Sequence, residues 1–271
     1  MLSGWISYWT LPVISGVTWL AMLLAMLIYW AGHQDAAHLI SMEDDQTIAY
    51  ISDIGALTLK PLFIAGSSVT AVFFAVSFIA TRWLRHRGRL LPNVTMFQRV
   101  LISLNILSAL VGMAGLIFLT IFDAHRHSNV HTICLVLFLL GFIFSAVFAC
   151  WEFHSLRRYY TEEPLLRVSF WVKFVFIIVE GSLAITFGVL ARQDEYDAAA
   201  VLEWIIAIIF TFYVFSYVMD LWPAVHTKKP EMRYKRSAQG QSESPDSTSI
   251  SPQAMEEGSV QQPPRALLGN F

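Results

Sequence analysis

Two apolar stretches decide the fold: residues 100–122 have the sequence VLISLNILSALVGMAGLIFLTIF, and residues 131–153 have the sequence HTICLVLFLLGFIFSAVFACWEF. A helix of about 20 apolar residues spans the hydrocarbon core of a bilayer, which is about 30 Å thick. Four further stretches of this kind occur, at residues 9–30, 61–80, 168–190 and 198–222. The alternation of polar and apolar residues typical of membrane barrel strands is absent. The sequence therefore predicts an all-α polytopic membrane protein, a bundle of six transmembrane helices.

The composition supports this class. Of the 271 residues, 56% are apolar and 14% are charged, whereas soluble domains have about 25% charged residues and a lower apolar share. The net charge of −2 argues against nucleic acid as a partner, because binding to nucleic acid needs a concentrated basic face. A water-soluble globular protein is excluded.

The loop charges predict an orientation. Most of the 18 Lys and Arg residues lie between the second and third spans, between the fourth and fifth, and after the sixth. Because basic loops stay in the cytosol, both termini are expected there, and the acidic residues 31–60 and 191–197 are expected outside. Residues 1–226 form the predicted membrane domain. Residues 227–271 are rich in Ser, Gln, Pro and Glu, which predicts a disordered cytosolic tail.

Polar residues inside the spans need partners. Glu180 lies near the middle of the fifth span, where a charged side chain costs about 2.5–3.5 kcal/mol. Asn105, Ser67 and Ser68 are the candidate hydrogen-bond partners. Two interpretations stay open: a polar contact in a cavity or lipid pathway, or a hydrogen-bonded residue of helix packing.

Two other charged residues lie nearer the predicted cytosolic ends of their spans. Lys173 is expected to extend toward the headgroups. Asp220, beside Trp222, is expected to mark the polar end of the last span.

Two basic clusters on the predicted cytosolic segments are the expected binding sites for anionic phospholipids. Each Lys or Arg near an anionic leaflet contributes about 1 kcal/mol of attraction. The expected lipid-binding residues are Arg82, Arg85, Arg87, Arg89, Lys228, Lys229, Arg233, Lys235 and Arg236. The alternative is that these charges only set the topology.

Residues 122–131, FDAHRHSNVH, place three candidate site residues at the outer junction of the third and fourth spans: Asp123, His127 and His131. Together with Glu203 they are side chains of the kinds that hold zinc or act as acid and base. Neither an HExxH motif nor a nucleophile elbow is present. A structural turn, a headgroup contact and a metal or catalytic centre all remain open, and we expect no metal or other cofactor.

Three motifs carry a family resemblance. Residues 50–56, YISDIGA, followed by Pro61, resemble the Y-I-S-D-x-G-x…P signature of the DRAM family (damage-regulated autophagy modulators). That family includes the yeast suppressor-of-four-kinase membrane protein and is related to the amino-terminal part of the calcofluor-white-hypersensitivity protein. Residues 122–131 are similar to its F-D-x-x-x-H-x-x-x-H stretch, and the last span to its E-W…D-L pattern. The motif residues are Ser52, Asp53, Gly55, Pro61, Asp123, His131, Glu203, Trp204 and Asp220.

The resemblance implies a six-span protein tied to lipid organisation. The yeast branch of the family is linked to a phosphatidylinositol 4-kinase at the plasma membrane, and the mammalian branch to lysosomes and autophagy. The polar tail and basic loops resemble the yeast branch.

We therefore expect an integral membrane regulator of lipid organisation that supports phosphoinositide signalling and is not an enzyme. The plasma membrane is favoured over the vacuole, lysosome or other endomembranes. The expected partners are anionic phospholipids and a cytosolic lipid-kinase complex. The alternative is a lipid- or GPI-anchor-remodelling enzyme with an exofacial centre of Asp123, His127, His131 and Glu203.

Overall fold

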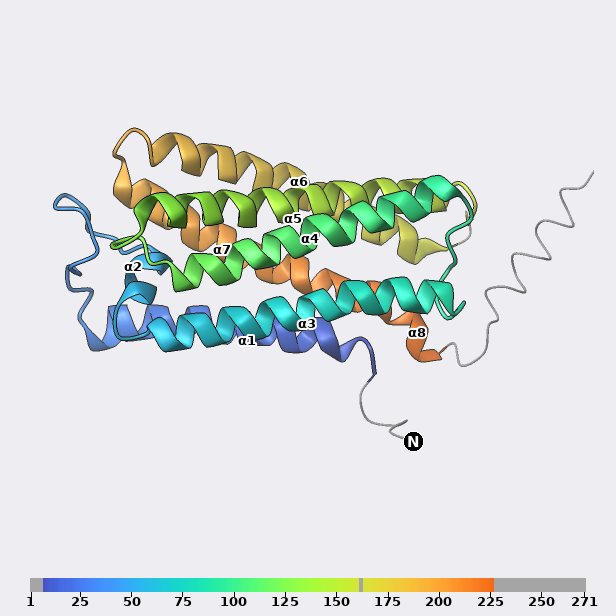
Figure 1. Ribbon diagram of the computed structural model, residues 1–271, viewed down its shortest axis with the longest axis horizontal. Helices are drawn as coiled ribbons and strands as arrows, with labels where there is room; N and C mark the ends of the chain where they lie inside the picture. Colours follow the sequence, from blue (N-terminus) through green and yellow to red (C-terminus); the bar gives the residue numbers. More distant parts are fainter. Residues whose placement is uncertain (1–6, 161–162, 227–271) are drawn as a thin grey trace, which may run out of the picture. The chain divides into compact units, whose positions relative to one another are not determined.

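The structure, a computed structural model, describes residues 7–160 and 163–226, and the described residues are helical, without strands (Figure 1). The predicted tail, residues 227–271, lies outside the described residues. The six long helices are α1 (Thr10–Ile28), α3 (Lys60–His86), α4 (Met96–Ile121), α5 (Ser128–Arg157), α6 (Pro164–Leu190) and α7 (Tyr196–Leu221). All six are long and apolar enough to cross a membrane, which confirms the predicted fold class.

Three shorter elements complete the chain: the π-helical turn η1 (Tyr29–His33), α2 (Ile51–Ala56) and α8 (Pro223–His226). Several long helices extend beyond the predicted apolar stretches because polar turns continue them at their ends. The helix α4 begins with a capping box, in which the Thr95 hydroxyl accepts the backbone N–H of Gln98. The Gln98 side chain accepts the Thr95 N–H in return, so that two end groups of the helix are satisfied.

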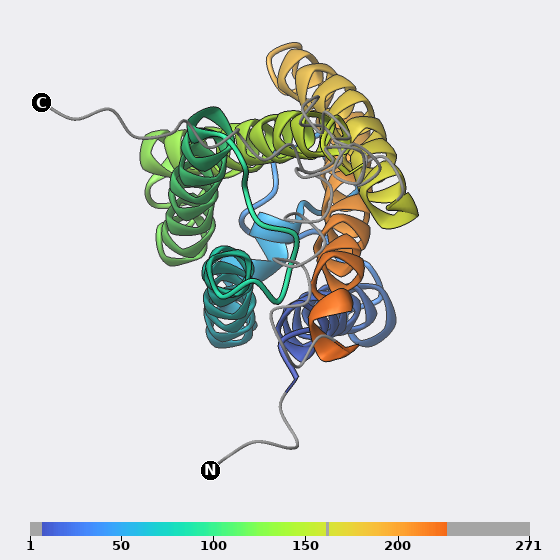
Figure 2. The same ribbon diagram turned by 90° about the vertical axis from the view of Figure 1, so that its right-hand side faces the viewer.

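The long helices form a closed ring. Each contacts the next in the order α1, α3, α4, α5, α6, α7, and α7 contacts α1 again, as the end-on view in Figure 2 shows. Aromatic rings fill the middle of the bundle: Phe74 of α3 lies 5.7 Å from Phe142 of α5 and 6.1 Å from Phe210 of α7, measured between ring centroids. The ring of helices thus has an apolar core of its own.

Glycines allow the closest packing in the bundle, between α4 and α5. A Cβ atom at Gly141 would lie 2.4 Å from the backbone nitrogen of Gly112, and one at Gly115 would lie 2.6 Å from the backbone nitrogen of Phe138. Small residues let helix backbones approach in lipid, where no hydrophobic force pushes helices together. The structure therefore has glycines at the positions where the backbones of α4 and α5 approach most closely.

The helix α6 belongs to the bundle over only part of its length. Its buried residues recur every three or four positions and end at midspan: Leu166, Ser169, Lys173, Phe176 and Glu180. None of residues 181–190 is buried. The second half of α6 therefore borders the bundle without being enclosed by it.

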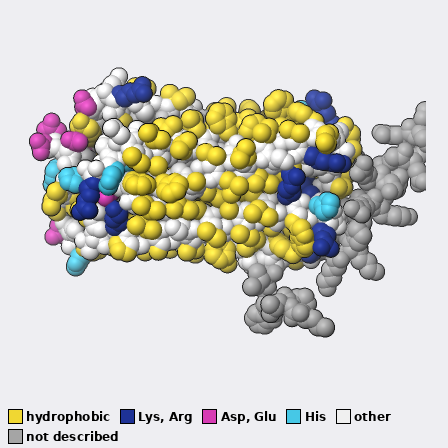
Figure 3. All heavy atoms as spheres, in the orientation of Figure 1, with side chains coloured by type: hydrophobic (Ala, Val, Ile, Leu, Met, Phe, Trp, Pro, Cys, Tyr) yellow, Lys and Arg dark blue, Asp and Glu magenta, His cyan; other side chains and the backbone are white. Residues whose placement is uncertain are grey.

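The bundle has two chemically different ends, separated by a hydrophobic band (Figure 3). We call the end with residues 87–95 and 158–160 the basic end, and the end with residues 34–50, 122–127 and 191–195 the acidic end. The described chain starts and finishes at the basic end, where the rings of Trp9 and Trp222 lie 5.6 Å apart. This agrees with an even number of crossings.

Candidate functional site

A buried ion pair joins α6 to α7 in the half of the bundle toward the basic end. Lys173 Nζ lies 2.6 Å from Asp220 Oδ2 and 2.9 Å from the Ser169 hydroxyl, which also donates to Asp220. The Lys173 ammonium is also 4.5 Å from the centroid of the Tyr217 ring. The exposed fraction of the Lys173 side chain is 0%, so the expectation that Lys173 extends to the headgroups is wrong. A buried charged partner on α7 removes the need for it to reach the headgroups.

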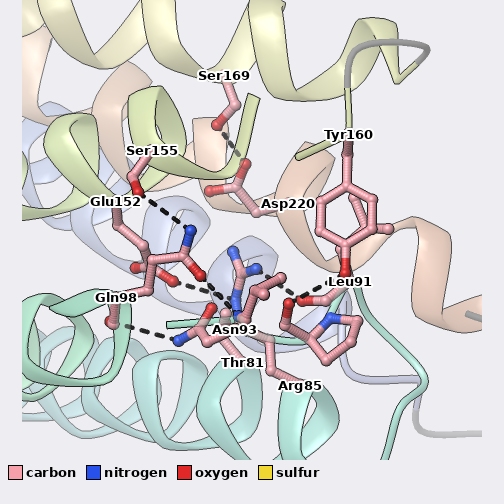
Figure 4. A network of polar contacts seen from close by, with 12 residues as sticks. Thr81, Arg85, Leu91, Asn93, Gln98, Glu152, Ser155, Tyr160, Ser169 and Asp220 are labelled. Atoms are coloured by element: carbon pink, nitrogen blue, oxygen red, sulfur yellow. Dashed lines mark hydrogen bonds and ion pairs between the residues drawn. The ribbon is translucent and has the colours of Figure 1, made fainter. Parts of the chain in front are cut away.

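A second buried pair joins α3 to α5. Arg85 Nε lies 3.4 Å from Glu152 Oε1, without the geometry of a hydrogen bond, and Arg85 Nη1 donates to the Leu91 carbonyl at 3.0 Å. Figure 4 shows Arg85 and Glu152 inside this polar network, close to Asp220. The exposed fractions of the two paired side chains are 7% and 3%. Arg85 is therefore held inside the bundle, away from the surface that meets headgroups.

The other predicted lipid-binding arginines on the described residues lie at the basic end. Arg82 is exposed and donates to the Ser103 hydroxyl. Arg87 lies over the Trp83 ring, and Arg89 donates to the Ala224 carbonyl. The remaining members of the predicted set are outside the described residues: Lys228, Lys229, Arg233, Lys235 and Arg236.

The basic end also carries a pocket that the sequence analysis did not single out. It is an open hollow of about 590 Å³, a volume that includes space open to the surroundings, and it is lined by His154, Arg157, Arg158, Glu163 and Arg167. We call these five residues the basic pocket. Its lining contains three guanidinium groups, one imidazole and a single carboxylate. The pocket therefore has a net positive charge. The sequence did contain a sign of this pocket. A short connection joins the end of α5 to the start of α6, so the basic residues at these two helix ends must lie close together.

At the acidic end, carboxylates of α7 hold the segment that precedes α3. Glu203 Oε2 accepts the backbone N–H of Ile51 at 2.7 Å. Asp197 accepts the Thr47 and Ile48 N–H groups at 2.7 and 2.8 Å. One residue after Glu203, the Trp204 indole donates to the Ala49 carbonyl at 3.0 Å. Asp197 and the Glu-Trp motif of the last span therefore together fix residues 47–51 across the bundle.

Asp53, a residue of the first sequence motif, stabilises the start of α2 through its own carboxylate. Its Oδ2 atom accepts the Tyr50 N–H at 3.0 Å and the Gln46 side-chain amide at 2.9 Å. Burial raises the pKa of Asp53 to about 6, although these two hydrogen bonds favour the ionised form. Two residues on, a Cβ atom at Gly55 would lie 2.3 Å from the Phe63 ring, so only glycine fits there.

The raised pKa of Asp53 makes stability depend on pH. The pKa of Asp53 in the folded protein lies above the ordinary value of 3.8 for an aspartate, so the folded protein binds this proton more tightly than the unfolded chain does. The contribution of Asp53 to the free energy of unfolding therefore falls as the pH rises from about 4 to about 6. Asp53→Asn retains an acceptor for the Tyr50 N–H but cannot ionise.

We expect the thermal unfolding midpoint of the wild type to fall relative to that of Asp53→Asn across this pH range. Circular dichroism melts of the two purified proteins in one detergent would measure the difference. If the difference between the two unfolding midpoints were the same at pH 4 and at pH 6, ionisation of Asp53 would not affect stability.

The residues of the second motif are engaged with neighbours in or near their own turn. Asp123 forms an ion pair with Lys60 at 2.7 Å and accepts the Arg126 N–H at 2.8 Å. Burial by itself would raise the pKa of Asp123, but the hydrogen bonds and charges of Lys60 and Arg126 outweigh it and lower the pKa. A ring nitrogen of His131 lies 2.8 Å from the Phe122 carbonyl. The nearby His127 packs its ring against Phe122.

The structure therefore brings Asp123, His127 and His131 to one turn but gives Glu203 a different partner, the backbone of α2. Within residues 7–160 and 163–226, no group of three or more His, Cys, Asp or Glu side chains is placed to hold a metal ion. Of the other motif residues, Ser52 is buried on α2, and Pro61 lies in the first turn of α3. At the start of a helix a proline removes no helical hydrogen bond.

Glu180 does not meet the partners that the sequence suggested. Asn105 instead accepts a hydrogen bond from the Ser145 hydroxyl at 2.6 Å, and Ser67 lies against Met22. Atom Oε1 of the Glu180 carboxylate is buried, and it has no hydrogen-bond partner among the described residues. Glu180 also marks the position beyond which α6 is no longer buried.

Comparison with known proteins identifies relatives. A family model described as the Frag1/DRAM/Sfk1/Cwh43P N-terminal domain matches residues 7–224. Protein sfk1 of Schizosaccharomyces pombe is 35% identical over 217 residues, which are 79% of this chain and 63% of that protein. Protein SFK1 of Saccharomyces cerevisiae is 28% identical over 187 residues, which are 59% of this chain and 53% of that protein.

The aligned regions make up less than two thirds of the length of both relatives. No solved structure matches the chain. The family match, by contrast, covers all six long helices and the three motifs. The chain therefore belongs to the Frag1/DRAM/Sfk1/Cwh43 N-terminal-domain family.

Proposed function

We propose that this protein is a membrane regulator of lipid organisation that binds anionic phospholipid headgroups at its basic end and supports phosphoinositide signalling. The observation that carries the proposal is the basic pocket at the junction of α5 and α6. Arginine suits phosphate because its planar guanidinium donates two parallel hydrogen bonds to one phosphate group. A pocket with three such groups and one carboxylate favours an anionic ligand.

The surroundings of the pocket favour a lipid as the source of that anion. Trp151, Tyr159 and Trp171 lie near the same helix ends, with exposed fractions of 53%, 47% and 53%. Tryptophan and tyrosine are enriched where a membrane protein crosses the headgroup level. A headgroup at this depth would meet the basic pocket while its chains remain in the hydrocarbon.

The cellular part of the proposal rests on the family and on charge. The positive-inside rule predicts that the basic end lies in the cytosol, next to the leaflet that carries anionic lipids. The family resemblance links the yeast branch to a phosphatidylinositol 4-kinase, and both relatives identified above are sfk1 proteins. The proposed partners are therefore anionic phospholipids and a lipid-kinase complex, with the plasma membrane as the favoured site.

The regulator is favoured over the lipid-remodelling enzyme for a structural reason. Of the four residues expected to form the exofacial centre of that enzyme, only Asp123, His127 and His131 share one turn, and there Asp123 is paired with Lys60 and His131 with the Phe122 carbonyl. Glu203 is engaged instead with the backbone of Ile51 in α2.

Neutralising the basic pocket is expected to weaken headgroup binding. The variant replaces Arg157, Arg158 and Arg167 by Gln in the full chain, held in phosphatidylcholine nanodiscs. Each lost charge removes about 1 kcal/mol of attraction, so the Kd for short-chain phosphatidylinositol 4-phosphate should rise about a hundredfold. Isothermal titration calorimetry measures the Kd.

The matched control replaces Arg126 and Arg192, which lie at the acidic end, by Gln and should leave the Kd unchanged. Equal affinities of the wild type and the basic-pocket variant would refute the binding site. In cells lacking the protein, the wild type and the control, but not the basic-pocket variant, should restore the plasma-membrane level of phosphatidylinositol 4-phosphate. Restoration by all three would refute the link between headgroup binding and signalling.

A further inference from the structure

A second pocket lies inside the ring of helices, in the half toward the acidic end. It encloses about 450 Å³, including the space at its mouth, and all six long helices and α2 contribute to its wall. The wall is apolar, with large side chains such as Trp19, Phe63, Leu119 and Phe138, and Glu203 is the one charged residue that lines it among the described residues. We call this space the inner pocket. The contacts described above do not explain why this space is present.

The inner pocket opens toward the hydrophobic band. Most of its wall is buried, and the residues that are only partly buried are Leu135 and Leu139 of α5, Phe187 of α6 and Glu203 of α7. The α5 and α6 residues among them lie beside the half of α6 in which none of residues 181–190 is buried. The neighbouring α5 residue Leu140, 46% exposed, belongs to the hydrophobic band. The mouth thus lies between α5 and the second half of α6.

The pocket has an apolar floor and a polar group at its other end. Phe138, ten residues and about 15 Å into α5, packs against Phe210 at 5.6 Å and closes the floor with the aromatic core. Toward the acidic end the wall is formed by Ile51 and by Glu203, whose carboxylate already accepts the Ile51 N–H. The wall is therefore apolar deep in the membrane and polar nearer the surface, and a lipid has the same order, with an apolar acyl tail below its polar ester region.

We propose that the inner pocket holds one acyl chain of a glycerophospholipid from the leaflet at the acidic end. The chain enters between α5 and α6, its terminal methyl lies against Phe138, and the glycerol and ester region lies near Glu203. The first sequence motif supplies Ile51 to this wall, and the third supplies Glu203. The motif residues therefore build a lipid site, and their contacts also hold α2 over it. This site is at the opposite end of the bundle from the basic pocket and does not depend on it.

Photocrosslinking of the full chain in phosphatidylcholine nanodiscs tests the proposal. The probe is phosphatidylcholine with a diazirine on one acyl chain, and mass spectrometry locates the tagged residues. A diazirine near the terminal methyl should tag the buried residues Leu119 and Phe138. A diazirine near the ester should tag Ile51 and Glu203. Tags confined to outward-facing residues such as Leu140, with either probe, would overturn the proposal.

A variant at the mouth provides the matched comparison. Leu139→Trp places a bulky ring at the entrance, whereas Leu140→Trp places the same ring on the adjacent residue, which does not line the pocket. Leu139→Trp should abolish tagging of Leu119 and keep the tagging of Val136 on the lipid-facing surface, which also reports correct insertion. Leu140→Trp should behave as the wild type. Undiminished tagging of Leu119 in the inserted Leu139→Trp protein would overturn the proposal.

Discussion

Replacing Lys173 by Met is expected to lower the free energy of unfolding by about 3–5 kcal/mol, because the change leaves a buried carboxylate without its counter-charge. The side chains of Lys173 and Asp220 are 0% and 3% exposed, and their charged atoms are 2.6 Å apart. In lipid no water can take the place of the missing ammonium. Reversible unfolding of the purified protein in mixed micelles with increasing dodecyl sulfate would measure the loss.

Two further variants make the Lys173 prediction specific. The double variant Lys173→Met and Asp220→Leu should recover most of the stability, because replacing both partners of a buried pair by apolar groups is often neutral. Lys60→Met removes the partner of Asp123 at a side chain that is 28% exposed, and it should cost less, about 1 kcal/mol. If Lys173→Met were as stable as the wild type, the pair could not hold α6 to α7.

Replacing Gly141 by Ala is expected to lower the free energy of unfolding by about 3 kcal/mol, at the upper end of the usual range for overpacking. The added methyl would lie 2.4 Å from the backbone nitrogen and 2.5 Å from the Cα atom of Gly112. Both neighbours are backbone atoms, so α4 and α5 must move apart to admit it. The same dodecyl sulfate titration would measure the effect.

Gly188→Ala is the matched control for Gly141→Ala. It places the same methyl on α6, where nothing lies within 4 Å of the new Cβ atom. Alanine has the higher helix propensity, by about 1 kcal/mol, so this variant should be as stable as the wild type or slightly more stable. Equal stability of Gly141→Ala and Gly188→Ala would show that the α4–α5 contact is looser than the structure has it.

The helices were predictable because each carries its own signal. A run such as residues 131–153 is apolar over the whole thickness of a bilayer, and this does not depend on its neighbours. The helix ends were harder to predict, since α5 continues through polar residues to Arg157. The contact between Gly112 and Gly141 also has a local sign, because small residues inside membrane helices are typical of helix–helix interfaces.

The buried ion pair was not predictable in the same way. Lys173 and Asp220 are 47 positions apart in the sequence, and their contact depends on how α6 and α7 rotate against each other. A lysine near the end of a span is equally compatible with extension to the headgroups. Only the packed bundle distinguishes the two arrangements.

The sites at the two ends of the bundle were not equally easy to predict from the sequence. Glu203 was grouped with the histidines of residues 122–131, but in the structure it meets Ile51, because the irregular residues 34–50 and α2 connect α1 to α3 at that end. Irregular segments have no periodicity from which such a placement can be derived. The arginines of the basic pocket were visible in the sequence but served there only to assign topology.

The two proposals together describe a protein that holds lipids of both leaflets, one by its headgroup and one by its chain. Both proposals depend on the side of the membrane at which each end lies. The orientation is also what connects the basic pocket to cytosolic phosphoinositides, since the opposite orientation would present it to the outside.

Cysteine labelling in cells tests the orientation most directly. Arg87→Cys at the basic end and Glu195→Cys at the acidic end are both at exposed positions, whereas the native Cys134 and Cys150 are buried. With a membrane-impermeant maleimide, Arg87→Cys should stay unlabelled in intact cells and become labelled when digitonin opens only the plasma membrane. Glu195→Cys should be labelled in intact cells at the plasma membrane, or only after full detergent in an endomembrane. Labelling of Arg87→Cys in intact cells, or only after full detergent, would contradict a cytosolic basic end and the headgroup binding proposed for it.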